Sequence, residues 1–272
     1  MFDTETTGLS SLSSLVELGA VKMRGFKVVD TFHTLIRPWD PIPEEALRVH
    51  GISQEMVRKA PEAKDVLLDF KEFCDGSVLV AHNAPFDLKI ISVHLQRLEE
   101  LLWENHIFDT REISKRHFPE VESHSLENLC KVWRSPFKGQ HRALDDARHT
   151  AFVMSRMAGK MGIDSSVTLS ELMELWGPTL HMKRFSLEHA LLNAPSAVRE
   201  KVERLRAALR DGTPVSYTYL KGGEQRCSMD EVLPKAIFSP GDRIYVEVLS
   251  PNRRNRSWVC RVDWIMNLRK GS

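Results

Sequence analysis

The chain has 272 residues, a formal net charge of +1 at pH 7 and 42% residues of hydrophobic type, as is ordinary for a globular protein of one large or two smaller domains. No apolar run is long enough to span a bilayer and no signal peptide opens the sequence, so we expect no membrane segment. The four cysteines, Cys74, Cys130, Cys227 and Cys260, lie far apart and have neither metal-binding nor redox spacing. These features favour a reduced, cytoplasmic setting.

The charge is unevenly distributed along the chain. Residues 196–272 carry 15 Lys and Arg against 9 Asp and Glu, whereas residues 1–195 carry 23 against 28. A basic C-terminal part could hold a polyanion that an acid-rich site would repel. A merely solvated basic surface explains the same distribution equally well.

Two acidic residues stand close together at the start of the sequence. Asp3 and Glu5 are two positions apart, so on a strand both side chains point to one face. Thr6-Thr7-Gly8 then ends the strand in a tight turn. Neighbouring carboxylates repel each other and titrate abnormally unless a cation lies between them. By itself, an exposed acidic strand end is the more common explanation of this pattern.

The next segment predicts a β-hairpin followed by helices. Leu15 to Met23 and Phe26 to Ile36 are two β-rich runs, and the proline-rich residues 37–43 border the second one. Ser53 is expected to cap a helix N-terminus. Apolar residues recur with helical spacing from Ala63 to Phe73.

A second stretch places a carboxylate beside a strand end. Val78 to Ala81 is a short apolar run typical of a buried strand. Pro85 suits the first turn of a helix that continues to Leu95. Asp87 would therefore lie near the N-terminus of that helix and near the carboxyl end of the strand.

A third stretch joins a histidine to another carboxylate. It follows a short predicted strand at Ile107 to Thr110 and a predicted helix from Ser125 to Trp133. His141 lies just before a further helix and Asp146 in its first turns, so both can reach one cleft. Taken alone, His141 is more typical of a surface or capping residue. Because a meander of strands precedes strands that alternate with helices, we expect an α/β fold with a site at the carboxyl end of a strand.

In this order, the three stretches resemble the motifs of a known enzyme family. Phe-Asp-x-Glu-Thr-Thr-Gly begins at Phe2, His-Asn-Ala-x-Phe-Asp at His82 and His-x-Ala-x-x-Asp-Ala at His141. This ordered triple is similar to that of the DEDDh 3′-5′ exonucleases, which include the proofreading epsilon subunit of bacterial replicative polymerase. The resemblance covers residues 1–160 and implies a ribonuclease H-like mixed sheet with flanking helices.

The resemblance also implies which residues form the site. By motif position, Asp3, Glu5, Asp87 and Asp146 would bind two Mg²⁺ or Mn²⁺ ions, and His141 would be the general base. Two divalent ions about 3.5–4 Å apart serve the nucleophile and the leaving group, and such hard cations prefer carboxylate oxygens. Histidine titrates near neutrality, so it can take a proton from the attacking water.

Substrate contacts are implied for Thr6, Leu9, His82 and Asn83. In the family, residues near the positions of His82 and Asn83 bind the scissile phosphate or sugar, and the residue that matches Leu9 touches the 3′-terminal base. From its residue type alone, Leu9 would instead be a core residue.

One departure from the family lies at the start of the sequence. Family members usually have several apolar residues before Phe-Asp, whereas Met1 directly precedes Phe2 here. We therefore expect a shortened first strand. Lost pairing beside Asp3 would weaken the metal geometry.

Beyond residue 160 the sequence changes character. Residues 161–210 contain helical patterns and predict a helical connector. Residues 211–272 contain short β-rich runs, including Trp258 to Ile265, with turns at Gly222-Gly223, Gly241-Asp242 and Pro251-Asn252. Strands at this spacing predict a small SH3-like β-barrel.

The layout of the predicted barrel resembles the WYL domain of bacterial regulators, with Ile244-Tyr245-Val246 in place of Trp-Tyr-Leu. The side chains that would neutralise and stack on a single strand are Arg253, Arg254, Arg256, Arg261, Tyr217, Tyr219 and Trp258. The aromatic ones would equally serve as barrel core. A protein partner, or self-association, through the barrel is also expected.

Two functions are compatible with the sequence. The first is a metal-dependent 3′-5′ exonuclease that acts on single-stranded 3′ ends, of DNA or, in the alternative, of RNA. The second is a WYL-type regulatory protein whose nuclease fold grips nucleic acid without cutting it. All five catalytic positions hold the required residue types, and this favours the enzyme.

Overall fold

A computed structural model of the chain describes residues 1–221, 225–250 and 256–271. The chain divides into two compact units. Unit 1 comprises Met1–Ile91 and Trp103–His181, and unit 2 comprises Ser92–Leu102 and Met182–Ser272. Among the helices in the described ranges, none is both long and apolar enough to cross a membrane.

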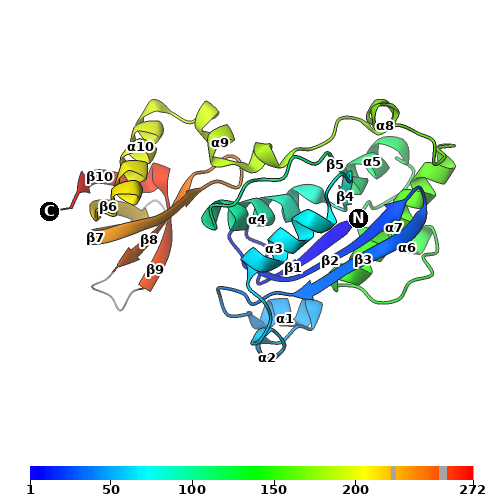
Figure 1. Cartoon of the computed structure of the whole chain (residues 1–272), viewed down its shortest axis with the longest axis horizontal. Helices are drawn as coiled ribbons and strands as arrows, with labels where there is room; N and C mark the ends of the chain where they lie inside the picture. Colours follow the sequence, from blue (N-terminus) through cyan, green and yellow to red (C-terminus); the bar gives the residue numbers. More distant parts are fainter. Residues whose placement is uncertain (222–224, 251–255, 272) are drawn as a thin grey trace. The chain divides into compact units, whose positions relative to one another are not determined.

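Unit 1 combines strands and helices (Figure 1). In chain order, its elements are β1 (Phe2–Thr6), β2 (Leu15–Arg24), β3 (Lys27–Leu35), α1 (Glu44–His50), α2 (Gln54–Val57), α3 (Ala63–Phe73), β4 (Leu79–Ala81), α4 (Ala84–Arg97), β5 (Ile107–Asp109), α5 (Thr110–His117), α6 (Leu126–Val132), α7 (Ala143–Lys160) and α8 (Leu169–Trp176). The last residues of α4, from Ser92 onward, group with unit 2. β1, β2 and β3 form an antiparallel sheet in that order, and β4 pairs with β5 in parallel. This confirms the predicted α/β class, with antiparallel pairing in one sheet of the described residues and parallel pairing in another.

Local sequence signals account for many of these elements. The predicted hairpin is β2 and β3, and α3 has the predicted bounds. Ser53 caps α2 through a bond from the Met56 nitrogen, and Ser125 caps α6 through a bond from the Asn128 nitrogen. The helices α1 and α5 had no predicted counterpart. Both are short, with seven and eight residues, and so carry little periodicity.

β1 is short, but it pairs with β2 from end to end. At its start, Met1 and Val21 exchange two backbone hydrogen bonds of 2.8 Å. The short first strand was expected to lose pairing beside Asp3. On the side that faces β2, this pairing is present. A cavity of about 690 Å³ adjoins this start of β1, with Met1 and Phe70 in its wall and with no predicted site residue among its lining.

The helices of unit 1 share an apolar core with β4 and β5. Val80 of β4 and Phe108 of β5 belong to one buried cluster with Leu129 of α6, Val153 of α7 and Trp176 of α8. The α8 helix, which lies in the predicted connector, is thus part of the core of unit 1. The other helices of that segment pack in unit 2.

Unit 2 is an antiparallel sheet with helices packed on it. Its elements after the end of α4 are η1 (Met182–Phe185), α9 (Leu187–Asn193), α10 (Ser196–Asp211), β6 (Val215–Lys221), β7 (Gln225–Phe238), β8 (Tyr245–Ser250), β9 (Arg256–Arg261), η3 (Val262–Trp264) and β10 (Ile265–Lys270). The strand order is β10-β6-β7-β8-β9. The C-terminal strands thus form the single antiparallel sheet named here the C-terminal sheet, residues 215–270. Its closure into a barrel and its likeness to a WYL domain stay predictions.

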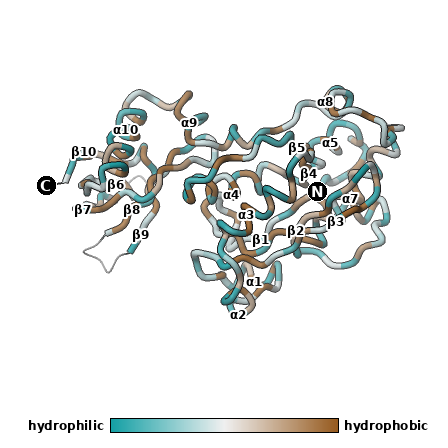
Figure 2. The backbone as a smooth tube through the Cα atoms, viewed as in Figure 1, coloured by the Kyte–Doolittle hydropathy of each residue, from teal (hydrophilic) through white to brown (hydrophobic). Residues whose placement is uncertain are grey.

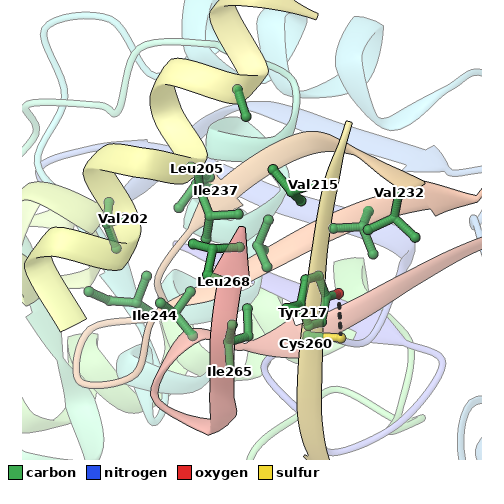
Figure 3. Close-up of a cluster of buried hydrophobic side chains, with 14 of the residues drawn as sticks. Val202, Leu205, Val215, Tyr217, Val232, Ile237, Ile244, Cys260, Ile265 and Leu268 are labelled. Atoms are coloured by element: carbon green, nitrogen blue, oxygen red, sulfur yellow. Dashed lines mark hydrogen bonds between the residues drawn. The ribbon is translucent and has the colours of Figure 1, made fainter. Parts of the chain in front are cut away.

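The core of unit 2 lies between α10 and the C-terminal sheet. Along α10, hydrophobic residues are interleaved with hydrophilic ones (Figure 2), and Val202 and Leu205 are both fully buried. They belong to one cluster with Ile265 of β10 and Tyr217 of β6, whose hydroxyl donates to the Cys260 sulfur at 3.5 Å (Figure 3). Tyr217 is therefore a core residue and cannot stack on a base.

The prediction of one continuous strand from Trp258 to Ile265 is wrong. β9 ends at Arg261, the turn η3 follows, and β10 begins at Ile265. The turn buries Val262, whose nitrogen donates to the Ile244 oxygen at 2.9 Å. No glycine or proline marks this turn, so the apolar run concealed it. The predicted turns at 222–223 and 251–252, and the predicted contacts Arg253 and Arg254, lie outside the described residues.

Candidate metal centre

Three of the four predicted metal carboxylates meet in unit 1. Asp3 and Glu5 lie on β1, and Asp146 lies in the first turn of α7. One ligand oxygen from each residue lies within 4.8 Å of the other two, and all three side chains are partly exposed. We call these residues the carboxylate triad. Oxygen ligands gathered at this spacing can share one divalent cation.

The approach of α7 to the sheet depends on Gly19. This residue lies opposite Asp3 in the β1–β2 pairing, and opposite residues of an antiparallel pair point to the same face of a sheet. A Cβ atom built on Gly19 would lie 2.2 Å from the Leu144 nitrogen and 2.4 Å from the Ala143 carbonyl carbon. Only glycine permits such a contact. The contact brings the first turn of α7, and with it Asp146, to β1.

The fourth predicted ligand, Asp87, is tied to the same strand. Its Oδ1 accepts a bond of 3.0 Å from the Thr4 nitrogen and one of 2.7 Å from the Thr4 hydroxyl. Asp87 is only 2% exposed and lies in the first turn of α4. It stands outside the carboxylate triad, but its charge helps to raise the pKa of Asp3.

Burial and mutual repulsion raise the pKa values of these carboxyl groups. The pKa of Asp3 is raised well above its usual range, by burial first and then by the charges of Asp87 and Asp146. Burial and the charge of Asp146 raise the pKa of Glu5 to about 8. Burial raises the pKa of Asp87 to about 7, although the bonds from Thr4 oppose the shift. A bound cation would relieve this repulsion, so the donor set fits a hard divalent metal.

His141, the predicted general base, lies at the entrance to α7. It is exposed and has a φ of 59°. Its backbone nitrogen donates to Asp146 Oδ2 at 2.9 Å, which holds the residue beside the carboxylate triad. Within the described residues, its exposed imidazole has no hydrogen-bond partner.

Two of the predicted substrate residues lie at the turn after β1. The Thr6 hydroxyl donates to the Gly8 oxygen at 2.7 Å and so supports the turn. Leu9 is 92% exposed. The interpretation of Leu9 as a core residue, which its type alone would favour, is therefore wrong.

The other two, His82 and Asn83, follow β4. Burial lowers the pKa of His82 to about 4, so its ring is neutral at neutral pH. Its Nδ1 lies 2.9 Å from the Thr110 hydroxyl and its Nε2 3.0 Å from the His124 oxygen. The Asn83 side-chain oxygen accepts from Arg111 Nη1 at 3.1 Å. Any contact of His82 with a substrate would require one of its two ring bonds to open.

Two buried acids beside the centre were not predicted as site residues. Glu17 is fully buried and lies opposite Glu5 in the β1–β2 pairing. Asp109, 7% exposed, accepts bonds of 2.9 Å from the Asn83 and Arg111 nitrogens. Each acid interrupts or ends an apolar strand run, and that interruption is the signal that could have found them.

Comparisons with known proteins agree on the N-terminal part of the chain. Residues 1–154 match the family described as Exonuclease (RNase_T). The PolC-type DNA polymerase III of Caldanaerobacter subterraneus subsp. tengcongensis is 38% identical over 173 residues, which are 63% of this chain and 12% of the polymerase. The PolC-type DNA polymerase III of Bacillus subtilis is 35% identical over 178 residues, 64% of this chain and 12% of the polymerase. The chain thus spans a small fraction of the length of these relatives.

Two solved structures are similar to this chain. Exonuclease X in complex with 5′ overhanging duplex DNA has a TM-score of 0.52 and 27% identity, over 65% of this chain and 98% of its own. E. coli Exonuclease I in complex with a dA16 oligonucleotide has a TM-score of 0.53 and 16% identity, over 92% of this chain and 53% of its own. The second likeness concerns the fold alone.

Proposed function

Since the chain belongs to the exonuclease family, we propose that it hydrolyses phosphodiester bonds at the 3′ end of nucleic acid, with single-stranded DNA as its substrate. The observation that carries this proposal is the carboxylate triad of Asp3, Glu5 and Asp146. Asp87, held to β1 through Thr4, adds a fourth carboxylate to the same strand.

The four carboxylates would hold two ions. Asp3, Glu5 and Asp146 would hold the first ion, and Asp3 with Asp87 would hold the second. The oxygen donors suit Mg²⁺ or Mn²⁺. When bound, two such ions neutralise phosphate charge and assist both the attacking water and the leaving 3′-oxygen. The raised pKa of Glu5 supports this assignment, because it reflects burial and then repulsion from Asp146, which a bound cation would offset. The pKa of Asp87 is raised mainly by its burial.

His141 would take a proton from the attacking water at an imidazole nitrogen. The bond from its backbone nitrogen to Asp146 supports this role, since it keeps the residue beside the carboxylate triad. Its exposure gives the abstracted proton a route to solvent.

Two features support a nucleic-acid end as the substrate, and the second favours DNA. Leu9 offers an apolar side chain, 92% exposed, to the face of a terminal base. The two PolC-type relatives are DNA polymerases, and Exonuclease X was solved with DNA. An RNA end would meet the same carboxylates, so cleavage of matched DNA and RNA strands tests the preference.

The test uses matched DNA and RNA single strands that carry a label at either end, with Mg²⁺ or Mn²⁺. We expect the 3′ label to leave at once as a mononucleotide, the 5′-labelled strand to shorten stepwise from its 3′ end, and a chelator to stop both. DNA should be cut faster than RNA. Faster cleavage of RNA would reassign the substrate, and tight binding without cleavage would indicate a regulatory protein instead.

His141→Ala tests the general base in the same assay. The rate should fall on the order of 10²–10⁴-fold, while Mn²⁺ binding persists, because the carboxylates are unchanged. A variant that turns over at the wild-type rate would remove His141 from the mechanism.

A further inference from the structure

We infer that Glu17 is a positioning residue for the proposed hydrolysis: together with Arg142 it fixes the first turn of α7 and thereby the place of His141 and Asp146. The inference rests on the proposed function of the carboxylate triad. It concerns two residues that bind no metal in that proposal.

The Glu17 carboxylate is saturated with hydrogen bonds. Arg142 Nε lies 3.1 Å from both of its oxygens, and Arg142 Nη2 lies 2.5 Å from Oε1. The Ala143 nitrogen donates to Oε2 at 2.8 Å, and His33 Nε2 lies 2.7 Å from Oε1. Three residues therefore hold one fully buried carboxylate.

These bonds connect β2 to the start of α7. Arg142 is the N-cap residue of α7, and its own side chain does not cap the helix. Glu17 of β2 provides the cap instead, because its carboxylate accepts a hydrogen bond from the nitrogen of the first helical residue, Ala143. A negative charge at this helix end is also favoured by the helix dipole.

The clamp formed by Glu17 and Arg142 acts on the residues that the reaction would need. Arg142 directly follows His141, and its carbonyl accepts from the Asp146 nitrogen at 2.9 Å. Asp146 in turn accepts from the His141 nitrogen. The backbone from His141 to Asp146 is thus fixed to β2, the strand next to the one that carries Asp3 and Glu5.

Only the Glu17 carboxylate of this ion pair is buried, whereas the Arg142 side chain is partly exposed. Ion pairs that bury a charge are a poor way to stabilise a fold, since apolar residues of similar size often serve as well. It does impose one geometry, because the guanidinium of Arg142 and the carboxylate of Glu17 meet in a planar fork. A catalytic site requires such a fixed geometry, because a misplacement of about 1 Å can lower the rate on the order of 10²-fold.

The double variant Glu17→Gln with Arg142→Gln separates positioning from stability. Arg142→Gln alone leaves the buried Glu17 carboxylate without its guanidinium partner, so the melting temperature should fall. The double variant contains neither charge, and its melting temperature should return toward the wild-type value. The charged fork is still absent. We therefore expect kcat on a short single strand to remain about 10–100-fold below the wild-type value, with KM unchanged.

His33→Gln is the matched control. It removes a contact to the same carboxylate but leaves the bonds to Arg142 and Ala143 in place, so kcat should be that of the wild type. A purely structural role would instead make kcat follow the melting temperature through all variants.

Hydrogen–deuterium exchange gives a readout that needs no turnover. In the double variant, the backbone of residues 139–146 should exchange faster than in the wild type, although global stability is restored. A double variant with wild-type kcat, or with unchanged exchange in this segment, would overturn the inference. If the wild type itself released no nucleotide, the proposed function would fail, and the exchange measurement would still decide whether the clamp orders this segment.

Discussion

Gly19 of β2 lies so close to Leu144 of α7 that a Cβ atom on the glycine would be 2.2 Å from the Leu144 nitrogen. Because Gly19 is opposite Asp3, this single contact sets how near the helix that carries Asp146 comes to the strand that carries Asp3 and Glu5. The carboxylate triad therefore depends on a residue without a side chain.

Gly19→Ala should push the start of α7 away from the sheet. A displacement of about 1 Å at a catalytic constellation can lower the rate on the order of 10²-fold, so we expect a large loss of nucleotide release together with a lower melting temperature. Gly159→Ala is the control in the same helix. Its added Cβ meets nothing within 4 Å, and alanine should stabilise a helix by about 0.5–1 kcal/mol. Equal activity of the two variants would contradict the close-contact account.

The raised pKa of Glu5 has a consequence for stability without metal. Its pKa rises from 4.5 in the unfolded chain to about 8 in the fold. Between these values the folded protein holds a proton that the unfolded chain has released, so stability should fall as the pH rises through this window. Added Mg²⁺ or Mn²⁺ should reverse the trend, with a larger rise in melting temperature at pH 8 than at pH 5.

Glu5→Gln isolates this effect. Other groups also titrate in the window, and the Met1 amino group, whose pKa burial lowers to about 6, acts in the opposite direction. The difference in melting temperature between wild type and Glu5→Gln largely cancels these contributions. In chelator, the variant should gain stability relative to the wild type as the pH rises from 5 to 8. A difference that does not change with pH would argue against a raised pKa.

Leu9 provides a test of substrate contact. Its side chain is 92% exposed, so Leu9→Ala should change the free energy of unfolding by less than about 0.5 kcal/mol. Truncation of a core leucine costs about 2–5 kcal/mol, and Leu18→Ala, at a fully buried position, serves as the reference. If Leu9 touches the terminal base, its variant should raise KM for an oligonucleotide. A normal KM would remove Leu9 from the substrate site.

The C-terminal sheet can be tested as a nucleic-acid grip by charge reversal. Removal of residues from 206 onward would be a poor test, because Val202 and Leu205 of α10 are buried against the sheet. Arg256 and Arg269 are exposed and lie near the ends of strands in this sheet. Replacing either with Glu should therefore not unfold the sheet. In an Asp3→Asn background, reversal of both should weaken binding of a long single strand and make its salt dependence shallower.

Arg58→Glu is the charge control in unit 1. Arg58 directly follows α2, is exposed and pairs with Glu55 at 2.9 Å. It should leave the salt slope as it was. Arg261 is a weaker candidate for phosphate contact than its residue type indicates, since it pairs with Asp263 and lies over the Trp264 ring. An unchanged slope in the double reversal would assign the basic residues to solvent contact alone.

Patterns that are local in sequence predicted much of the fold and the main outline of the site. The alternation of Asp3 and Glu5 placed both on one face of a strand, and the two β-rich runs, Leu15 to Met23 and Phe26 to Ile36, predicted a hairpin. The ordered motifs predicted that Asp146 would lie near Asp3, although it follows 143 positions later in the chain. The carboxylate triad shows that the two side chains do come together.

Features that depend on tertiary packing were not predictable in this way. The interruption of an apolar strand by Glu17 marks it as unusual, but its role was not predictable because its partner Arg142 lies 125 residues away. The turn η3 lies in an apolar run with no glycine or proline, so only packing reveals it. The α8 helix looked like part of a connector until Trp176 was found in the core of unit 1.

The central claim is that the carboxylate triad holds the cation needed for hydrolysis, and Asp146→Asn tests it most directly. The variant keeps the shape of the side chain but removes one charged ligand. The control is Asp145→Asn, the preceding residue, whose Oδ1 accepts from Arg148 at 3.0 Å and which is outside the triad. Mn²⁺ binding by calorimetry and mononucleotide release are measured on both. We expect Asp146→Asn to fold, to lose Mn²⁺ affinity and to lose release by orders of magnitude, while Asp145→Asn keeps both. A folded Asp146→Asn protein that binds Mn²⁺ and releases nucleotides as the wild type does would contradict the claim.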